Sequence, residues 1–350
     1  MRSILGEKKF IVLFLILFSL SGCNSKSGSE GVSVSNEAEP ETHVIRHLVG
    51  DWAPDYMITL ADELGYFKKN NVPVEIVRTV GYEGMLEVKN NDPEGDYAWC
   101  FTIFDALVER QTNIEPDLQL IYIQSYSEGS EAVLTAPGSG IVQLSDLKGK
   151  RVAIEPATIG EFFLGILLQR EGMSLSDLNL VEIPSQDTHT AFAKGEIDAA
   201  SVYEPAISLS VEQGATVLVD SKQERNINAD VCVARGKYID QYPELYASYV
   251  KSVLEAVDYY NEHPEEARQI IAGTELAKSF DANADRLEEN LSLLSMPGIK
   301  RNKVAFDRTS GFNSIYNMAK QNQQFLMDQG VIPDDSEFGD LVDGSLMERF

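Results

Sequence analysis

The chain has 350 residues, of which 43% are hydrophobic, enough apolar material for one large or two medium domains with packed cores. Its 55 acidic residues outnumber its 29 basic residues, so the formal net charge is −26. A surface of this charge repels phosphate backbones, which argues against nucleic acid as a partner. Beyond that, the acidity indicates solubility and does not select a fold.

The first residues have the order of a secretory signal peptide. Arg2, Lys8 and Lys9 give a basic start, and residues 10–18 form an apolar run. This run is shorter than the roughly 20 residues that a membrane-spanning helix needs. A basic start followed by a short apolar run is typical of a leader that is removed on export, so we expect residues 1–22 to be cleaved.

Cys23 follows the predicted leader and closes the sequence Leu-Ser-Gly-Cys, which resembles the lipobox of bacterial lipoproteins. The resemblance implies that Cys23 carries a lipid and becomes the new N-terminus; the alternative is an ordinary signal peptide with a chance cysteine. Residues 23–42 are polar and cannot bury enough surface to fold. We therefore expect a lipid-anchored protein on a flexible tether at the periplasmic or extracellular face of the cell membrane.

The sequence lacks common catalytic and metal-binding patterns. It contains no G-x-S-x-G, P-loop, G-x-G-x-x-G or C-x-x-C motif, and its four histidines are scattered. The remaining cysteines, Cys100 and Cys232, lie in apolar strand-like runs. They could form a disulfide in an oxidising compartment, but two buried thiols are the simpler prediction. We expect no metal, no cofactor and no enzymatic activity.

From His43 onward, strand-like and helix-like segments alternate, which indicates an α/β fold. Strands are expected at residues 44–49, 73–77, 97–101, 118–124, 132–135, 151–154, 180–183, 199–203 and 230–234. Helices are expected at residues 56–64, 84–88, 161–171, 190–194, 242–262, 265–272, 285–294 and 309–329.

The first and second parts of this series repeat one order of strand, loop, helix, glycine and strand. Gly65 and Gly172 stand where a helix ends, a position that favours glycine in the left-handed conformation. Parallel sheets bind ligands beyond the carboxyl ends of their strands, so two facing lobes would share one cleft. We expect one lobe from residues 43–125 and 230–350, and a second lobe from residues 126–229.

Four segments carry a family resemblance. Residues 144–153 (LSDLKGKRVA) resemble the DLKGKxVA opening of the second lobe of periplasmic binding proteins, and residues 191–200 (AFAKGEIDAA) resemble their AFxxGxIDAA segment. Residues 202–205 (VYEP) look like the xWEP box that follows, and residues 214–218 (GATVL) complete the series. Together they are similar to the aliphatic-sulfonate, taurine, nitrate and thiamine-pyrimidine-precursor binding proteins of ABC transporters.

The resemblance implies a two-lobed, type II-like periplasmic-binding-protein fold, in which each lobe is a mostly parallel sheet flanked by helices. It also implies a monomer that binds a small molecule between the lobes and delivers it to an ABC permease and its ATPase. In this family, loops at the strand ends touch the ligand. The matching positions here are Trp52, Tyr82, Glu83, Thr102, Tyr126, Thr158, Gly160, Glu161, Tyr203 and Glu204.

Several of these positions have a structural alternative. Trp52 could stack on a flat or apolar ligand, or pack as a lid. The glycines of residues 81–84 suit a close backbone approach or an ordinary turn. Thr158 opens a helix whose free N–H groups suit an anion, but Thr158 and Glu161 also spell the T-x-x-E capping box.

The charges near the predicted cleft favour a nitrogen-bearing ligand. Glu83, Glu161 and Glu204 lie in candidate ligand loops, whereas Arg78 and Arg235 are only nearby. A nitrate or bare sulfonate site needs fixed positive charge, and a buried carboxylate needs a donor. We therefore expect Glu204 to bind an amine, amidine or ring N–H, carried by a taurine-like zwitterion or by a heterocycle such as a thiamine-pyrimidine precursor.

Two other classes of protein compete with this interpretation. Eukaryotic thiamine-pyrimidine synthases share the fold, but they carry a cysteine-rich iron-binding run where residues 98–102 hold the single Cys100. A lipoprotein that senses a ligand and signals to a partner is the second alternative. A neighbouring permease and ATPase in the genome would favour transport, and a neighbouring histidine kinase would favour sensing.

Overall fold

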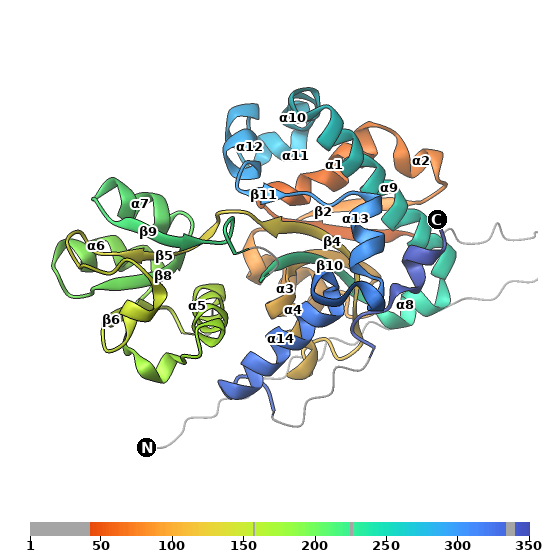
Figure 1. Cartoon of the computed structure of the whole chain (residues 1–350). Coiled ribbons are helices and arrows are strands. Elements are labelled where there is room, and N and C mark those ends of the chain that lie inside the picture. The colour runs from red at the N-terminus through yellow and green to blue at the C-terminus, as the bar shows by residue number, and fades with distance from the viewer. Residues whose placement is uncertain (1–42, 157, 225–226, 334–339) are drawn as a thin grey trace, which may run out of the picture. The chain divides into compact units, whose positions relative to one another are not determined.

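A computed structural model describes residues 43–350 apart from 157, 225–226 and 334–339 (Figure 1). The predicted leader, tether and lipidated Cys23 lie outside the described residues. The described chain contains two sheets, each with its own helices. Within these described ranges, no helix is both long and apolar enough to cross a membrane.

The larger sheet has six strands in the order β11-β4-β10-β3-β1-β2. Its strands are β1 (Ile45–Val49), β2 (Val74–Arg78), β3 (Tyr97–Thr102), β4 (Leu118–Ser127), β10 (Ala229–Arg235) and β11 (Leu294–Ser295). Strands β1, β2 and β3 are parallel, whereas β10 runs antiparallel to its neighbours β3 and β4. Because β10 and β11 come from late in the chain, two separate chain segments build this sheet.

The smaller sheet has five strands in the order β7-β6-β8-β5-β9. Its strands are β5 (Glu131–Thr135), β6 (Arg151–Ile154), β7 (Asn179–Glu182), β8 (Ala199–Tyr203) and β9 (Thr216–Asp220). Strands β6, β7 and β8 are parallel, and β5 runs antiparallel to β8 and β9. Its helices are α5 (Ile159–Arg170), α6 (Thr188–Ala193) and α7 (Ala206–Glu212).

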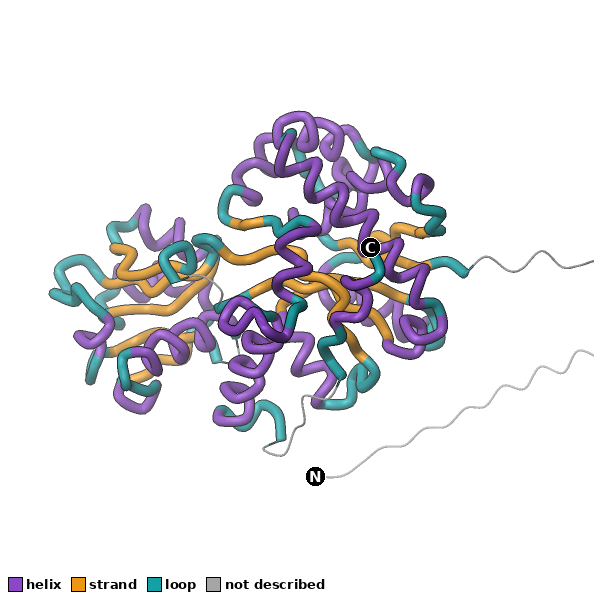
Figure 2. Tube along the Cα trace, turned by 45° about the vertical axis from the view of Figure 1, so that its right-hand side comes forward, coloured by secondary structure: helices purple, strands orange, loops and turns teal. Residues whose placement is uncertain are grey.

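Helices cover both faces of the larger sheet. Figure 1 shows α1, α9 and α10 on one face and α3, α4 and α14 on the other, and Figure 2 shows the orange strands between purple helices. The helices are α1 (Tyr56–Glu63), α2 (Tyr66–Lys69), α3 (Gly81–Asn91), α4 (Ile103–Gln111), α8 (Gly236–Gln241), α9 (Pro243–Glu262), α10 (Pro264–Gly273), α11 (Glu275–Ser279), α12 (Ala284–Leu291), α13 (Ile299–Ala305) and α14 (Ile315–Asp328).

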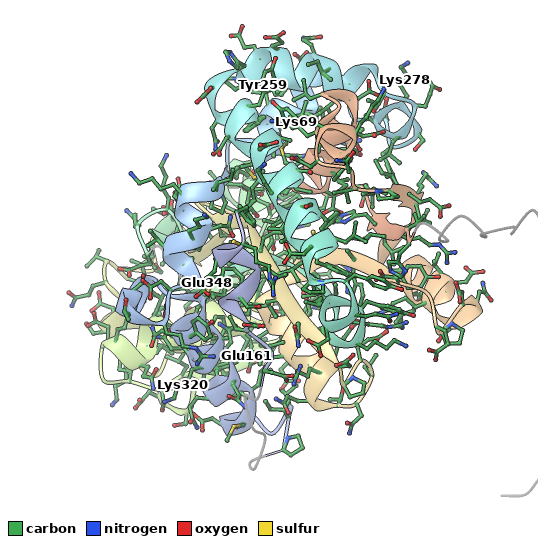
Figure 3. The ribbon with its side chains drawn as sticks, turned by 90° about the vertical axis from the view of Figure 1, so that its right-hand side faces the viewer. Lys69, Glu161, Tyr259, Lys278, Lys320 and Glu348 are labelled. Atoms are coloured by element: carbon green, nitrogen blue, oxygen red, sulfur yellow. The ribbon has the colours of Figure 1, made fainter. Side chains whose placement is uncertain are left out.

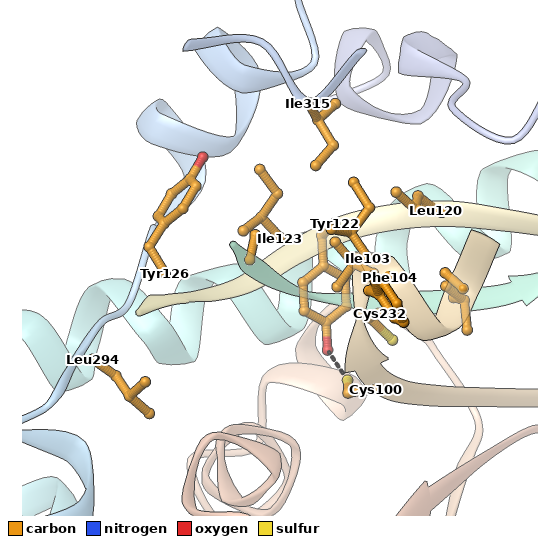
Figure 4. Close-up of a cluster of buried hydrophobic side chains, with 14 of the residues drawn as sticks. Cys100, Ile103, Phe104, Leu120, Tyr122, Ile123, Tyr126, Cys232, Leu294 and Ile315 are labelled. Atoms are coloured by element: carbon orange, nitrogen blue, oxygen red, sulfur yellow. Dashed lines mark hydrogen bonds between the residues drawn. The ribbon is translucent and has the colours of Figure 1, made fainter. Parts of the chain in front are cut away.

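The core of the larger sheet is built on its central strands. All residues of β4 are buried, as expected for a strand with helices on both of its faces. Trp99 of β3 is fully buried, and Tyr122 of β4 is 2% exposed. Cys100 lies opposite Cys232 in the β3–β10 register, and the Tyr122 hydroxyl lies 3.8 Å from the Cys100 sulfur (Figure 4). Both cysteines are buried free thiols, as the sequence predicts.

The chain crosses between the two sheets twice, from β4 to β5 and from β9 to β10. A third connection is made by packing, because Phe325 of α14 meets Phe162 of α5 edge-on with ring centroids 5.2 Å apart. A Cβ atom added to Gly165 of α5 would lie 2.5 Å from the Phe325 ring. Glycine at this position therefore allows α5 and α14 to approach closely.

Most predicted elements agree with the structure to within a few residues, and β6 and β8 have the predicted bounds. Gly65 and Gly172 have φ angles of 72° and 69°, so their predicted left-handed conformation is confirmed. The prediction of one helix over 309–329 is wrong. A 3₁₀ turn occupies its first part, and Gly311 within it has a φ of 58°, which breaks the helical backbone at that residue. Helix α14 then begins afresh, with the Ser314 hydroxyl accepting from the N–H of Asn317.

Candidate ligand-binding site

Trp52 stands at the surface, at the end of the loop that follows β1. Pro54 comes next, inside the 3₁₀ turn η1 (Ala53–Asp55), where its fixed φ suits a helical first turn. Trp52 is 42% exposed, and its indole N–H donates to Oδ2 of Asp230 at 3.1 Å. The ring is therefore held by one edge while much of its surface faces solvent.

Asp55 ends the same turn and is buried. Its carboxylate accepts hydrogen bonds from the side-chain amide of Gln124 at 2.8 Å and from the backbone N–H of Gly50 at 3.1 Å. Burial outweighs both hydrogen bonds and raises the pKa of Asp55 to about 6. A carboxylate is thus held in an environment that disfavours its charge.

Asp230 lies near the start of β10, opposite Ser125 of β4. Its carboxylate accepts from the Ser125 hydroxyl at 2.6 Å and from the Trp52 indole. Burial raises the pKa of Asp230 to about 6, and the negative charges of Glu131 and Asp55 add to the rise. Glu131 and Asp55 are therefore close enough to influence Asp230.

Glu131 opens β5 and is 4% exposed. Its carboxylate accepts from the Ser127 hydroxyl at 2.9 Å and from the side-chain amide of Asn228 at 3.3 Å. Asp55, Glu131 and Asp230 surround the end of β4, where the chain crosses to the smaller sheet, and we call them the crossover carboxylates.

The buried cations of the larger sheet are paired elsewhere. The Lys89 ammonium lies 3.4 Å from the carboxylates of both Glu109 and Glu115, and the Arg235 guanidinium lies 2.9 Å from Glu115. Arg78, which is exposed, donates to the Ser279 hydroxyl at 2.8 Å. Across the described part of the chain, no lysine or arginine forms an ion pair with a crossover carboxylate.

A cavity of about 430 Å³ opens beside Trp52 and Asp55. Asp51 and Asp105 add acidic groups to its wall, and Phe101 adds an aromatic face. The thiol of Cys100 also lines this cavity, and burial raises the pKa of that thiol well above its ordinary value. The wall is therefore acidic on one part and apolar on another.

Two predicted site residues of the larger sheet have clear structural contacts. The Thr102 hydroxyl accepts from the N–H of Asp105 at 3.1 Å and so caps helix α4. Tyr126 of β4 is 8% exposed, and the Arg301 guanidinium lies over its ring, 5.3 Å from the centroid. Figure 4 shows Tyr126 at the edge of the cluster of buried apolar side chains. Burial raises the pKa of Tyr126 to about 12.

The segment 81–84 forms the start of helix α3, so the ordinary turn considered for its glycines is wrong. Gly81 begins the helix with a φ of 62°. Glu83 lies exposed in its first turn, where a negative charge favours the helix dipole. The side chain of Tyr82 lies outside the described residues.

Thr158 stands at the N-cap of α5, but the capping box considered above is not formed. Its hydroxyl donates to the carbonyl oxygen of Glu155 at 2.7 Å and does not cap the helix. A Cβ atom at Gly160 would lie 3.0 Å from the carbonyl oxygen of Ser201, so glycine brings α5 close to β8. Glu161 is 7% exposed, and Figure 3 shows it in the lower part of the view, away from Lys69 and Lys278 in the upper part.

Tyr203 ends β8 at the carboxyl edge of the smaller sheet. Its hydroxyl donates to the carboxylate of Glu155 at 3.1 Å, and the same carboxylate oxygen accepts from the N–H of Ser185 at 3.1 Å. Strands β6, β7 and β8 therefore meet at Glu155, which sequence analysis did not select.

Glu204 differs from expectation. The prediction assumed a carboxylate without donors of its own, and this premise is wrong. Its carboxylate accepts from the N–H of Ser208 at 3.1 Å and from the Ser208 hydroxyl at 3.0 Å, across the start of α7. Its backbone N–H donates to Ser130. A role of Glu204 in ligand binding stays a prediction.

A short series of contacts connects the two ends of the predicted site. Trp52 bonds to Asp230 at the start of β10, and Asn228, two residues earlier, bonds to Glu131. Glu131 in turn stands opposite Tyr203 in the β5–β8 register. The structure thus brings Trp52 and Tyr203 to the same crossing of chains, whereas Thr158, Gly160 and Glu161 lie at the start of α5.

Sequence analysis missed the crossover carboxylates. A usable signal was present, because Glu131 and Asp230 are charged residues at the start of apolar strand-like runs. Charged residues are rarely buried without a partner, so such positions point to a specific role. Asp55 carried no comparable signal, since it follows Pro54 in what resembles an ordinary turn.

Comparison with known proteins agrees with this architecture. The structure is similar to the periplasmic aliphatic sulphonate binding protein SsuA of Escherichia coli, with a TM-score of 0.62 and 17% identity, over 83% of this chain and 94% of that one. It is also similar to the desulfurization enzyme DszB, with a TM-score of 0.59 and 14% identity, over 87% of this chain and 98% of that one. These likenesses show the predicted two-lobed fold.

The sequence comparisons add the family. A putative aliphatic sulfonates-binding protein of Bacillus subtilis (strain 168) is 24% identical over 278 residues, which cover 75% of this chain and 77% of the relative. The family model described as NMT1/THI5 like matches residues 55–267. The match covers most of both sheets, and the chain therefore belongs to the NMT1/THI5-like family.

Proposed function

We propose that this chain is the solute-binding lipoprotein of an ABC importer. It captures a small organic molecule between two lobes, 43–125 with 230–350 and 126–229, and delivers it to a permease and its ATPase as a monomer. Family membership supports this role, because the Bacillus subtilis relative is named as a binding protein and not as an enzyme.

The observation that carries the proposal is a group of acidic side chains, two buried and one half-buried, where the chain crosses between the sheets. Asp55, Glu131 and Asp230 come from both crossing regions and from the loop beside β1. A ligand bound there would touch both lobes at once. Two of the binding residues predicted from sequence, Trp52 and Tyr203, lie at the same crossing, and Trp52 offers an aromatic surface.

The ligand that we propose carries nitrogen. Sulfonate binding is named in relatives of this chain, but a sulfonate needs fixed positive charge, and the buried Lys89 and Arg235 are paired with Glu109 and Glu115. A zwitterion or a heterocycle with ring N–H groups fits the acidic wall better.

Export and lipid attachment complete the proposal. The leader 1–22 is removed, and Cys23 then carries the lipid that holds the protein at the cell surface. Mass spectrometry of the membrane fraction is expected to find an acylated N-terminal Cys23. An intact leader or a free Cys23 thiol in that fraction would contradict this part of the proposal.

A thermal-shift screen of the purified mature protein against small nitrogen-bearing solutes tests the binding role. A ligand at a hundred times its dissociation constant adds about 2.7 kcal/mol to the free energy of unfolding. We expect one chemical class to raise the melting temperature in a saturable way. A deletion strain should also lose uptake of that solute. If no solute shifts the melting temperature and uptake is unchanged by deletion, the proposal is wrong.

An enzyme is the second candidate, because DszB shares the fold. A nucleophilic cysteine needs a thiolate that a substrate can reach. Burial raises the pKa of Cys100, which lines the cavity, whereas hydrogen bonds to Cys100 and His47 lower the pKa of Cys232 to about 5 despite its burial. Cys232 is fully buried and is not among the residues that line that cavity. Binding without chemical change is therefore the better supported function.

A further inference from the structure

Asp55 and Glu131 are buried and Asp230 is half-buried, and none of the three has a lysine or arginine partner among the described residues. Asp55 accepts only from Gln124 and Gly50, and Glu131 and Asp230 accept only from hydroxyl, amide and indole groups among the described residues. Burial of a charge is costly unless it is paired. Three such groups around the end of one strand form a negative site in which His47, acting on Asp55, is the one positive group identified among the described residues.

Two buried amides supply an independent observation. Gln124 and Asn228 are 3% and 6% exposed, and each donates its NH₂ group to a crossover carboxylate. Their carbonyl oxygens, Oε1 of Gln124 and Oδ1 of Asn228, have no hydrogen-bond partner among the described residues. Reversal of either amide would place an oxygen against a carboxylate oxygen, so the present orientation is fixed by charge.

The unfilled oxygens of these two amides are both acceptors. Two amide oxygens lie beside the carboxylates to which their own NH₂ groups are bonded. Only a molecule with several N–H or O–H donors satisfies them. An anion would meet carboxylates and carbonyl oxygens, and no lysine or arginine is paired with these carboxylates in the described part of the chain.

The spacing of these groups argues against a metal ion. In the ranges that the structure describes, no group of three or more His, Cys, Asp or Glu side chains is close enough to hold one. The negative charge is spread over a larger volume than one coordination sphere. An organic cation whose donors point in several directions fits that spread.

An apolar wall adjoins the charge. The cavity beside Asp55 is lined by Trp52, Met85 and Phe101. The Trp52 indole N–H donates to Asp230, so the edge of the ring lies at the carboxylate. The Trp52 residue as a whole is 42% exposed. Aromatic faces attract cations and also stack on flat ligand bodies.

We propose that this crossing site binds an organic cation, an ammonium, amidinium or guanidinium group on an apolar or aromatic body. The cationic N–H groups lie among Asp55, Glu131 and Asp230 and donate to the free amide oxygens of Gln124 and Asn228. The body of the ligand occupies the cavity beside Trp52. The inference rests on the proposed solute-binding function and names its ligand class.

Four probes of similar size test this inference by calorimetry on the mature protein: benzylammonium, benzamidinium, benzyl alcohol and benzenesulfonate. We expect at least one of the two cations to bind saturably at millimolar concentration, and the alcohol and the sulfonate not to bind. Asp230→Asn should weaken the cation about thirty-fold or more, because one charged partner is lost. The control Asp62→Asn changes the net charge equally at an exposed position of α1 and should leave binding unchanged.

Each contrary result overturns the inference in a distinct way. Binding of benzenesulfonate alone would show an anion site, while the solute-binding function would stand. If neither cation binds at 50 millimolar, about five times the largest dissociation constant that we expect, the cation site is ruled out, whatever other solutes bind. An equal loss in Asp230→Asn and Asp62→Asn would show an effect of net charge only. If no solute of any class bound in the wider screen, the proposed function itself would fail. The melting temperature of Asp230→Asn checks that the variant is folded.

Discussion

Replacement of Asp230 by asparagine should change the free energy of unfolding in a pH-dependent way. Relative to the natural chain, the variant should be more favoured at neutral pH than at acid pH. Asparagine keeps a side-chain oxygen that can accept from Trp52 and Ser125. What it removes is a negative charge whose pKa rises to about 6 in the folded protein. The perturbation therefore isolates the free-energy cost of ionising this carboxyl group in the native state.

The sign follows from proton linkage. A raised pKa means that the native state holds the proton more tightly than the unfolded state, in which an aspartate has a pKa near ~4. The contribution to stability is complete below pH ~4 and is lost as pH rises through about 6. One pKa unit corresponds to about 1.4 kcal/mol, and because Asp230 is partly exposed we expect a loss of roughly 1–3 kcal/mol.

Urea unfolding at a series of pH values from 4 to 8 measures this effect. The difference in free energy of unfolding between Asp230→Asn and the natural chain should rise by roughly 1–3 kcal/mol between pH ~4 and ~7. Lost or distorted hydrogen bonds shift this difference by a constant and leave its slope intact. A flat difference, like that expected for the exposed control Asp62→Asn, would refute the reasoning.

Three further predictions follow from packing and hydrogen bonding. Gly165→Leu should destabilise the protein by about 1–3 kcal/mol in urea unfolding, because even a Cβ atom there would lie 2.5 Å from Phe325; an unchanged midpoint would contradict the close packing of α5 on α14. Asn302→Ala should cost roughly 2–4 kcal/mol in the same assay, since the Asn302 amide bonds both the N–H and the carbonyl of Ile123 in the middle of β4; a loss below ~0.5 kcal/mol would show that water replaces it. Trp52→Ala should weaken ligand binding about 3- to 10-fold with little change in melting temperature, and calorimetry showing unchanged affinity would remove Trp52 from the site.

The fold was largely predictable because its signals are local. Apolar runs between turn residues predicted β6 and β8 with their bounds, and Gly65 and Gly172 ended helices in the left-handed conformation. The failures are also local. Gly311 and the Ser314 cap interrupt a helix that the apolar pattern alone continues, because periodicity does not register a backbone break.

The candidate site was less predictable because it depends on contacts between distant segments. Strand-end positions such as Trp52 and Tyr203 followed from the family pattern. The pairing of Gln124 with Asp55 and of Asn228 with Glu131 joins residues 69 and 97 positions apart. No local sequence pattern predicts hydrogen bonds between residues so far apart in the chain. Glu204 shows the opposite error, since its donors come from Ser208, only four residues away.

Calorimetric titration of the mature protein with the solute that most raises its melting temperature, followed by mass spectrometry of the recovered solute, tests the central claim most directly. The account predicts saturable binding of one molecule per chain and recovery of that molecule chemically unchanged. Conversion of the solute into a product, or heat without saturation, would contradict the claim that this chain is a solute-binding protein.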